Sequence, residues 1–127
     1  MNRRNISAPD APSTHGRYLQ AVEVSRPERV VFVSGQNPLD ANGAVPESFG
    51  EQARLVWANT FAQLRAADMS GDDIVKVTTY LADRSYRGEN AAVREEVLGA
   101  LNPALTVVVC DIYDEAWLLE IEVVAAR

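Results

Sequence analysis

The chain has 127 residues, of which 47% are hydrophobic, and this is the size and composition of one globular domain with a substantial core. Its formal net charge of −6 repels phosphate groups, so we expect neither nucleic acid nor an anionic membrane as a partner. No apolar run approaches the ~18 residues that span a bilayer, and the single cysteine, Cys110, excludes an intrachain disulfide, which together favour a cytoplasmic protein.

Metal and cofactor sites lack their usual sequence motifs. The one histidine, His15, belongs to no HExxH or CxxC pattern, and no glycine-rich phosphate-binding loop occurs. We therefore expect no metal and no cofactor, and we interpret His15 as a solvated loop residue. Residues 1–127 are predicted to form one domain, in which the polar residues 1–15 are a flexible or loosely packed segment with Arg3 and Arg4 in solvent.

The first half of the chain predicts two strands and a helix. Residues 18–24 alternate apolar and polar side chains, and residues 30–35 are rich in β-branched types, so we expect two strands that pair as a hairpin. Ser48 and Glu51 fit a capping box at the start of a helix. The apolar stripe of this helix, which we expect in the core, comprises Ala53, Val56, Trp57, Thr60, Phe61, Leu64 and Ala67.

The second half of the chain predicts three strands and a second helix. They are expected at 74–83 (strand), 89–101 (helix), 104–110 (strand) and 117–125 (strand). The order of elements is therefore β-β-α-β-α-β-β. Because each helix has a single apolar stripe, we expect both helices to cover one face of a mainly antiparallel sheet, which makes an α+β domain.

Both faces of the strand at 104–110 are apolar. Leu105, Val107 and Val109 point to one side of it. Val108 points to the other side. A two-layer domain leaves the outer face of its sheet in water, where a valine-rich surface is unfavourable. We therefore predict a homo-oligomer whose sheets pack against each other, with clefts where the subunits meet.

Four segments occur in a characteristic order, namely SGQNPLD after a strand, EQARLVWANTFAQLRAADMSGDDIVKVTTYLAD, NPALTVVV and LLEIEVVAAR. In this order they resemble the RidA/YjgF family of reactive-imine deaminases, over nearly the whole chain from about Gly16. The resemblance implies a chorismate-mutase-like α+β fold and a homotrimer with three ligand clefts between neighbouring subunits. It also implies binding of small carboxylates and hydrolysis of enamine or imine intermediates to keto acids and ammonia.

The resemblance maps a cleft onto this chain. Its ligand-binding positions fall on Tyr18, Ser34, Gly35, Gln36, Asn90, Leu105 and Val107, and its strand glutamate falls on Glu120. Glu120 is the candidate catalytic residue, as a general acid or base, and the alternative is a hydrogen bond to a neighbouring subunit. We interpret Glu122 as a solvent or interface charge and Asn90 as the N-cap of the second helix. For Tyr18, a hydrogen bond to a ligand and packing at a subunit boundary both stay open.

The chain departs from the family pattern at residue 105. The family's active members read Pro-Ala-Arg, whereas this chain has Pro103, Ala104 and Leu105. Leucine offers a carboxylate no donor, and a charge-assisted hydrogen bond is worth roughly 1.5–3 kcal/mol. We therefore expect the usual imino acids to bind poorly in the usual pose. Arg17, beside Tyr18, could supply the missing charge, although an exposed arginine near the terminus is the favoured interpretation.

Two functions are in competition. The first is a cofactor-independent deaminase or hydrolase of a small imine or enamine, in which Glu120 activates water and backbone amides near Gly35 and Val107 stabilise developing charge. The second is a trimer that binds a small metabolite or a partner protein without turnover. Leu105 favours the second for standard substrates, and the presence of Glu120 keeps the first open. The acidic net charge disfavours a nuclease.

Overall fold

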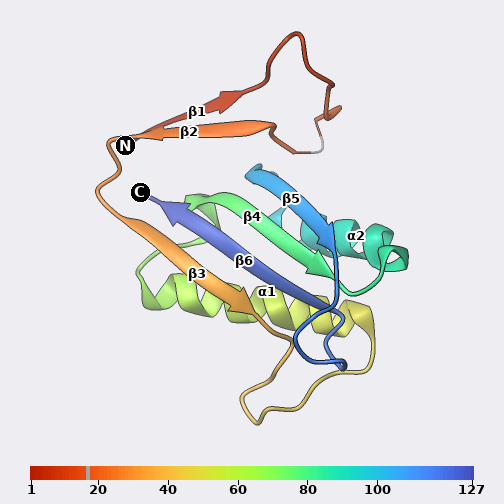
Figure 1. Cartoon of the computed structure of the whole chain (residues 1–127). Helices are drawn as coiled ribbons and strands as arrows, with labels where there is room; N and C mark the ends of the chain where they lie inside the picture. Colours follow the sequence, from red (N-terminus) through yellow and green to blue (C-terminus); the bar gives the residue numbers. More distant parts are fainter. Residues whose placement is uncertain (17) are drawn as a thin grey trace.

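The computed structural model describes residues 1–16 and 18–127 (Figure 1). In chain order its elements are β1 (Asn2–Ile6), β2 (Ala21–Ser25), β3 (Val30–Gln36), α1 (Phe49–Ala66), the 3₁₀ helix η1 (Gly71–Asp73), β4 (Ile74–Leu81), the 3₁₀ helix η2 (Arg84–Tyr86), α2 (Arg87–Leu98), β5 (Ala104–Val109) and β6 (Leu119–Ala126). In this described part of the chain, no helix is long and apolar enough to cross a membrane.

Four of the strands form a sheet in the order β3-β6-β4-β5, with α1 and α2 on one face (Figure 1). β6 runs antiparallel to both β3 and β4, whereas β5 runs parallel to β4. The parallel pair arises because α2 forms the crossover between β4 and β5, which brings the chain back to start the next strand at the same end. The predicted α+β domain, with both helices on one face of a mainly antiparallel sheet, is confirmed.

The core lies between the sheet and the two helices. Trp57 of α1 is 1% exposed and Leu64 is fully buried, as the apolar stripe predicted. On the sheet side, β6 alternates buried and half-buried residues, with Ile121 among the fully buried ones. Of the capping box expected before α1, the described residues form the serine half, because the amide of Glu51 donates to Ser48 Oγ at 3.2 Å.

The predicted hairpin of the first two strands is wrong. The strand predicted first, β2, pairs antiparallel with β1, and β3 pairs instead with β6. This pairing sets Val33 of β3 opposite Val123 of β6, and both are buried in the core, whereas β2 has no fully buried residue. β1 was not predicted because its sequence, NRRNI, has no apolar alternation. The ribbon of β1 and β2 stands apart from the four-stranded sheet in Figure 1.

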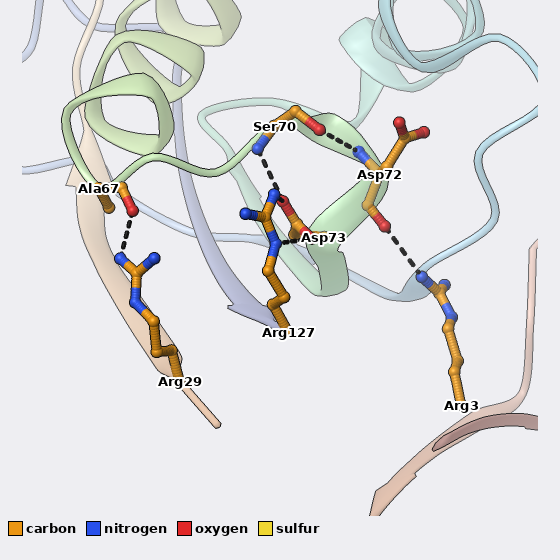
Figure 2. Close-up of polar contacts among 7 residues, drawn as sticks. All are labelled: Arg3, Arg29, Ala67, Ser70, Asp72, Asp73 and Arg127. Carbon is orange, nitrogen blue, oxygen red and sulfur yellow. Dashed lines mark hydrogen bonds and ion pairs between the residues drawn. The ribbon is translucent and has the colours of Figure 1, made fainter. Parts of the chain in front are cut away.

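Arg3 ties this ribbon to the rest of the chain (Figure 2). Its guanidinium donates to the backbone carbonyl of Asp72 at 3.4 Å, which Figure 2 shows. It also donates to the backbone carbonyls of Ile74 at 3.2 Å and Asn102 at 3.0 Å. The expectation that Arg3 is a purely solvated side chain is therefore wrong. Its long stem lets the charged end reach carbonyls that are about 70 to 100 residues away in sequence, and the sequence pattern gives no sign of this.

Two further arginines bind the segment that joins α1 to β4 (Figure 2). Arg127 Nη2 donates to Asp73 Oδ2 at 2.9 Å, and Arg29 donates to the carbonyl of Ala67. Asp73 also accepts a hydrogen bond from the amide of Ser70 at 2.8 Å. Burial raises the pKa of Asp73, but the hydrogen bonds from Ser70 and Arg127 outweigh it, so the pKa of this carboxyl lies below its usual value.

Candidate functional site

A cleft of about 660 Å³ lies between α2 and the helix-side face of β5. Four of the residues that the resemblance assigned to ligand binding line it, namely Tyr18, Asn90, Leu105 and Val107. Tyr18 precedes β2, Asn90 belongs to α2, and the other two belong to β5. Segments from three parts of the sequence therefore line this cavity within a single chain.

The floor of the cleft is apolar because Leu105 and Val107 of β5 lie on the same side of the sheet as the core-facing residues of β4. Leu105 and Val107 pair in register with Val77 and Thr79, whose side chains are buried. At the outer edge of the sheet the covering is incomplete, and Val107 and Val109 are 39% and 45% exposed. Pockets for small ligands commonly combine such an apolar surface with a few polar groups.

Asn90 supplies one polar group to this cleft. The structure corrects its predicted role, because α2 begins at Arg87 and Tyr86 occupies the N-cap position, which places Asn90 inside the first turn. The residue is 3% exposed, and no hydrogen bond joins its side-chain amide to another described residue, but the amide atoms are not among those sealed from solvent. Because Asn90 lines the cleft, its amide can bond water or a polar group of a ligand there.

Three arginines also line the cleft, and the sequence analysis did not find them. They are Arg84 of η2 and Arg87 and Arg94 of α2. None of the three has an ion pair with another described residue. Burial lowers the pKa of the Arg94 guanidinium, and the neighbouring Glu95 raises it. The signal available in the sequence was the spacing of seven between Arg87 and Arg94, which repeats after two helical turns.

Glu120 lies on the opposite face of the sheet from the cleft. It pairs in register with Tyr80, whereas its neighbour Leu119 pairs with Leu81, and both leucines are buried in the core beneath the helices. The alternation of β6 therefore points Glu120 to the open face. A single chain places the candidate catalytic carboxylate and Leu105 on different sides of the sheet.

Gly35 of β3 lies against Glu120 on the open side. A Cβ atom on Gly35 would lie 2.6 Å from Glu120 Cδ, so the glutamate packs directly across the glycine. This close approach explains why residue 35 has no side chain. The side-chain Nε2 of Gln36 donates to the backbone carbonyl of Ser34 at 2.9 Å, so this side chain bonds within β3.

Glu122 is held by a neighbouring strand. Tyr80 Oη of β4 donates a hydrogen bond to Glu122 Oε1 at 2.8 Å. This hydrogen bond, followed by burial and by the charges of Glu122 and Glu120, raises the pKa of Tyr80 above its ordinary value. The open face therefore carries an acidic, hydrogen-bonded cluster along β6.

The remaining residues named in the sequence analysis contribute no side chain to the cleft or to the cluster around Glu122 among the described residues. Arg17 lies outside the described residues. His15 is exposed, and Cys110 is half-buried just beyond the end of β5. Across residues 1–16 and 18–127, no group of three or more His, Cys, Asp or Glu side chains could hold a metal ion.

Comparisons with known proteins agree with this architecture. A family model described as Endoribonuclease L-PSP matches residues 8–127. A RutC family protein of Pyrococcus horikoshii is 33% identical over 124 residues, covering 96% of both chains. A 2-iminobutanoate/2-iminopropanoate deaminase of Salmonella typhimurium is 37% identical over 81 residues, or 63% of this chain and 61% of that protein. A Rid-family structure of unknown function from Yersinia pestis covers 100% of both chains with a TM-score of 0.86 and 25% identity. These matches confirm the chorismate-mutase-like α+β fold.

Proposed function

The chain belongs to the RidA/YjgF family, and from that premise we propose that it hydrolyses small imine or enamine metabolites and releases ammonia. The observation that carries the proposal is the cleft, which gathers Tyr18, Asn90 and Leu105 within one chain. The Salmonella relative is named for the deamination of 2-iminobutanoate and 2-iminopropanoate, which are small imines that carry a carboxylate.

The reaction needs proton transfer at two atoms. An enamine first takes up a proton at its β-carbon and loses one from nitrogen, which gives the imine. The oxygen of a water molecule bonds to the imine carbon and loses a proton, while the nitrogen takes up a proton. The hydroxyl group then loses its proton as the carbonyl forms, the nitrogen takes up a second proton, and the carbon–nitrogen bond breaks to release ammonia. No electrons are gained or lost, so the scheme requires no redox cofactor. We assign the proton transfers to Glu120 as general base and acid, and the orientation of the substrate to Tyr18 and Asn90.

We propose further that the working form is a homotrimer in which one copy supplies Glu120 to the cleft of its neighbour. Two observations support this assembly. Glu120 lies on the sheet face opposite the cleft, so within one copy it cannot reach a ligand there. Phe32, on the same open face, is 77% exposed, and a second copy would remove this large apolar side chain from water.

A second function has support from one residue. Leu105 gives a carboxylate no donor from β5, so binding of a small ligand without turnover is the alternative. The cleft would then serve as a binding site in the same assembly, and Glu120 would form hydrogen bonds between subunits without taking part in a reaction.

The first test measures deamination directly. We expect the protein to accelerate ammonia release from 2-aminoacrylate that is generated enzymatically in the assay. Glu120→Gln should lower this acceleration by about a hundredfold or more, because the side chain can no longer transfer protons. Glu47→Gln, at an exposed position before α1, is the matched control and should leave the rate unchanged.

Two results of this assay decide between the functions. An inert wild-type protein would overturn the catalytic proposal. If Leu105→Arg then gained activity, the cleft would be competent and the natural chain would be a binding protein.

A further inference from the structure

Three positive charges converge on the cleft, and the reaction scheme above uses none of them. Arg87 and Arg94 lie on one side of α2, two turns apart, and Arg84 lies just before the helix. The described residues that line the cleft include no aspartate or glutamate. In a chain with a net charge of −6, this is a local reversal of sign. Such a cleft attracts small anions and repels cations.

Arg94 is the most buried of the three, because it is half-buried while Arg84 and Arg87 are exposed. It also borders a small recess of about 30 Å³, whose lining includes Tyr18, Leu105 and the acidic Glu95. The burial that lowers its pKa reflects a charge partly withdrawn from water. Arginine nevertheless keeps its charge at neutral pH. Arg94 thus lines the same cleft as Leu105, the position at which the family has its own arginine.

If Arg94 served only to stabilise the fold, its side chain should form an ion pair or a hydrogen bond with another residue, as two other arginines do. Arg54 pairs with Glu96 at 2.8 Å, and Arg127 pairs with Asp73 at 2.9 Å. Arg94 has neither an ion pair nor a side-chain hydrogen bond among the described residues. A half-buried cation without a partner gains most from an anion that binds it through two hydrogen bonds.

A second observation points to the same ligand. Asn90 lies one turn before Arg94 on α2, lines the same cleft and is 3% exposed without a hydrogen-bond partner among the described residues. Residues four apart on a helix share a face. The first turn of α2 also borders the cleft, and the positive end of a helix dipole favours negative charge.

We propose that Arg94 binds the carboxylate of the ligand from α2 and so replaces the family's arginine on β5. Asn90 donates to the same end of the ligand, and Arg84 and Arg87 add positive potential. The hydrocarbon part of the ligand then packs on Leu105 and Val107. The family's arginine at position 105 would make this surface polar. The ligand is therefore a small organic anion with an apolar side chain, and each methylene buried on this floor should tighten binding by about fourfold. As a statement about substrate, this inference rests on the proposed function.

The experiment compares an anion with its neutral counterpart. The probes are 2-oxobutanoate, which is the carbonyl product of 2-iminobutanoate, and the uncharged 2-oxobutanamide. Titrations followed by amide NMR give both affinities and show whether each variant is folded. We expect the wild-type protein to prefer the anion, and Arg94→Gln to reduce this preference by about tenfold or more. Arg65→Gln, at an exposed position on α1, should retain the preference.

Two further variants keep the test decisive. Arg94→Lys retains the charge but loses the planar fork, so we expect intermediate affinity. If Arg94→Gln does not fold, this variant carries the test, and unchanged affinity would contradict a two-bond contact. Adding Leu105→Arg to Arg94→Gln should restore the preference, because the new guanidinium enters the same cleft from β5. If the double variant does not regain the preference for the anion, residues 94 and 105 do not contact the same carboxylate, and the proposal is wrong.

The results separate this inference from the proposed function. Equal binding of both probes by the wild-type protein, or an undiminished preference in Arg94→Gln, overturns the inference even if deamination is fast. A preference that depends on Arg94 supports the inference even if the protein proves inert toward 2-aminoacrylate, which would overturn only the catalytic proposal.

Discussion

Asp73 shows how single residues stabilise this domain. Its side chain is 12% exposed and accepts hydrogen bonds from Arg127 and from the backbone of Ser70. Its pKa is therefore lower in the folded protein than in the unfolded chain. A carboxyl with a lowered folded-state pKa adds stability above its unfolded pKa, and this contribution is lost as the pH falls through the folded pKa.

We expect Asp73→Asn to lower the free energy of unfolding by about 1 kcal/mol at pH 7, a modest value because Arg127 is half in solvent. The deficit should begin to shrink as the pH falls below the ordinary aspartate pKa of about 4, and it should be lost as the pH passes through the lower folded-state pKa of Asp73. Urea unfolding at several pH values measures this. Asp72→Asn is the control, because the Asp72 carboxylate makes none of the contacts drawn in Figure 2. A deficit that stays constant as the pH falls would contradict the electrostatic explanation.

Leu105 and Arg94 show that the positive charge of a cavity can come from a different element than it does in related proteins. Leu105 removes the donor that the family has on β5, and Arg94 brings a donor to the same cleft from α2. The two positions are eleven residues apart in sequence and on different elements, so neither can be judged alone. What matters for a ligand is the sum of charges that face it.

Among the elements, the ribbon of β1 and β2 depends on few contacts outside itself. β2 pairs only with β1 in the described sheets, and Arg3 provides three hydrogen bonds from the ribbon to the main body. A two-stranded ribbon alone is at best marginally stable in water. Its order should therefore depend strongly on Arg3, with a backbone bridge between Leu19 and Ala104 as the neighbouring attachment.

We expect Arg3→Ala to speed hydrogen exchange severalfold at the amides of β1 and β2 while the four-stranded sheet stays protected, because opening becomes local. Exchange followed by NMR or mass spectrometry measures the change. Arg4→Ala is the control, since the exposed pair of Arg4 and Glu23 lies within the ribbon and such pairs contribute little. Unchanged exchange in Arg3→Ala would show that other contacts hold the ribbon.

For the whole molecule, the decisive feature is the open face of the sheet. It carries the exposed Phe32 beside the acidic residues of β6, whereas the other face is covered by helices. The cleft and Glu120 lie on opposite sides of this sheet. Assembly and activity are therefore linked in our proposal, because only a neighbouring copy can complete the site.

We expect Phe32→Asp to weaken the assembly, since burying a phenylalanine contributes about 1.5–3 kcal/mol per copy and a buried unpaired carboxylate would cost more. Sedimentation velocity should show a folded trimer for the wild-type protein and a smaller species for the variant, with deamination lost in parallel. Ala62→Asp, at an exposed position on α1, should remain a trimer. A wild-type monomer at micromolar concentration would refute the shared site.

Much of the fold could be predicted from local patterns. The apolar stripe with Trp57 identified α1, and the uncharged, valine-rich run that contains Leu105 and Val107 identified the strand that forms the floor of the cleft. The resemblance also named Tyr18 and Asn90, which the structure brings into that cleft. Periodicity succeeds here because it reports which side of its own element a residue faces, and this is a local property.

The partners of each element were decided only in three dimensions. Strand β3 pairs with β6 because their buried valines meet across the core, and a hairpin with β2 would have left those side chains without this packing. Arg94 is one of several arginines in the sequence, and only the packing of α2 beside β5 gives it a place in the cleft. The sequence by itself determined the elements from β2 onward, their order and the apolar floor, but not β1. The tertiary structure decided which faces meet and where the charge lies, because these depend on contacts between residues that are far apart along the chain.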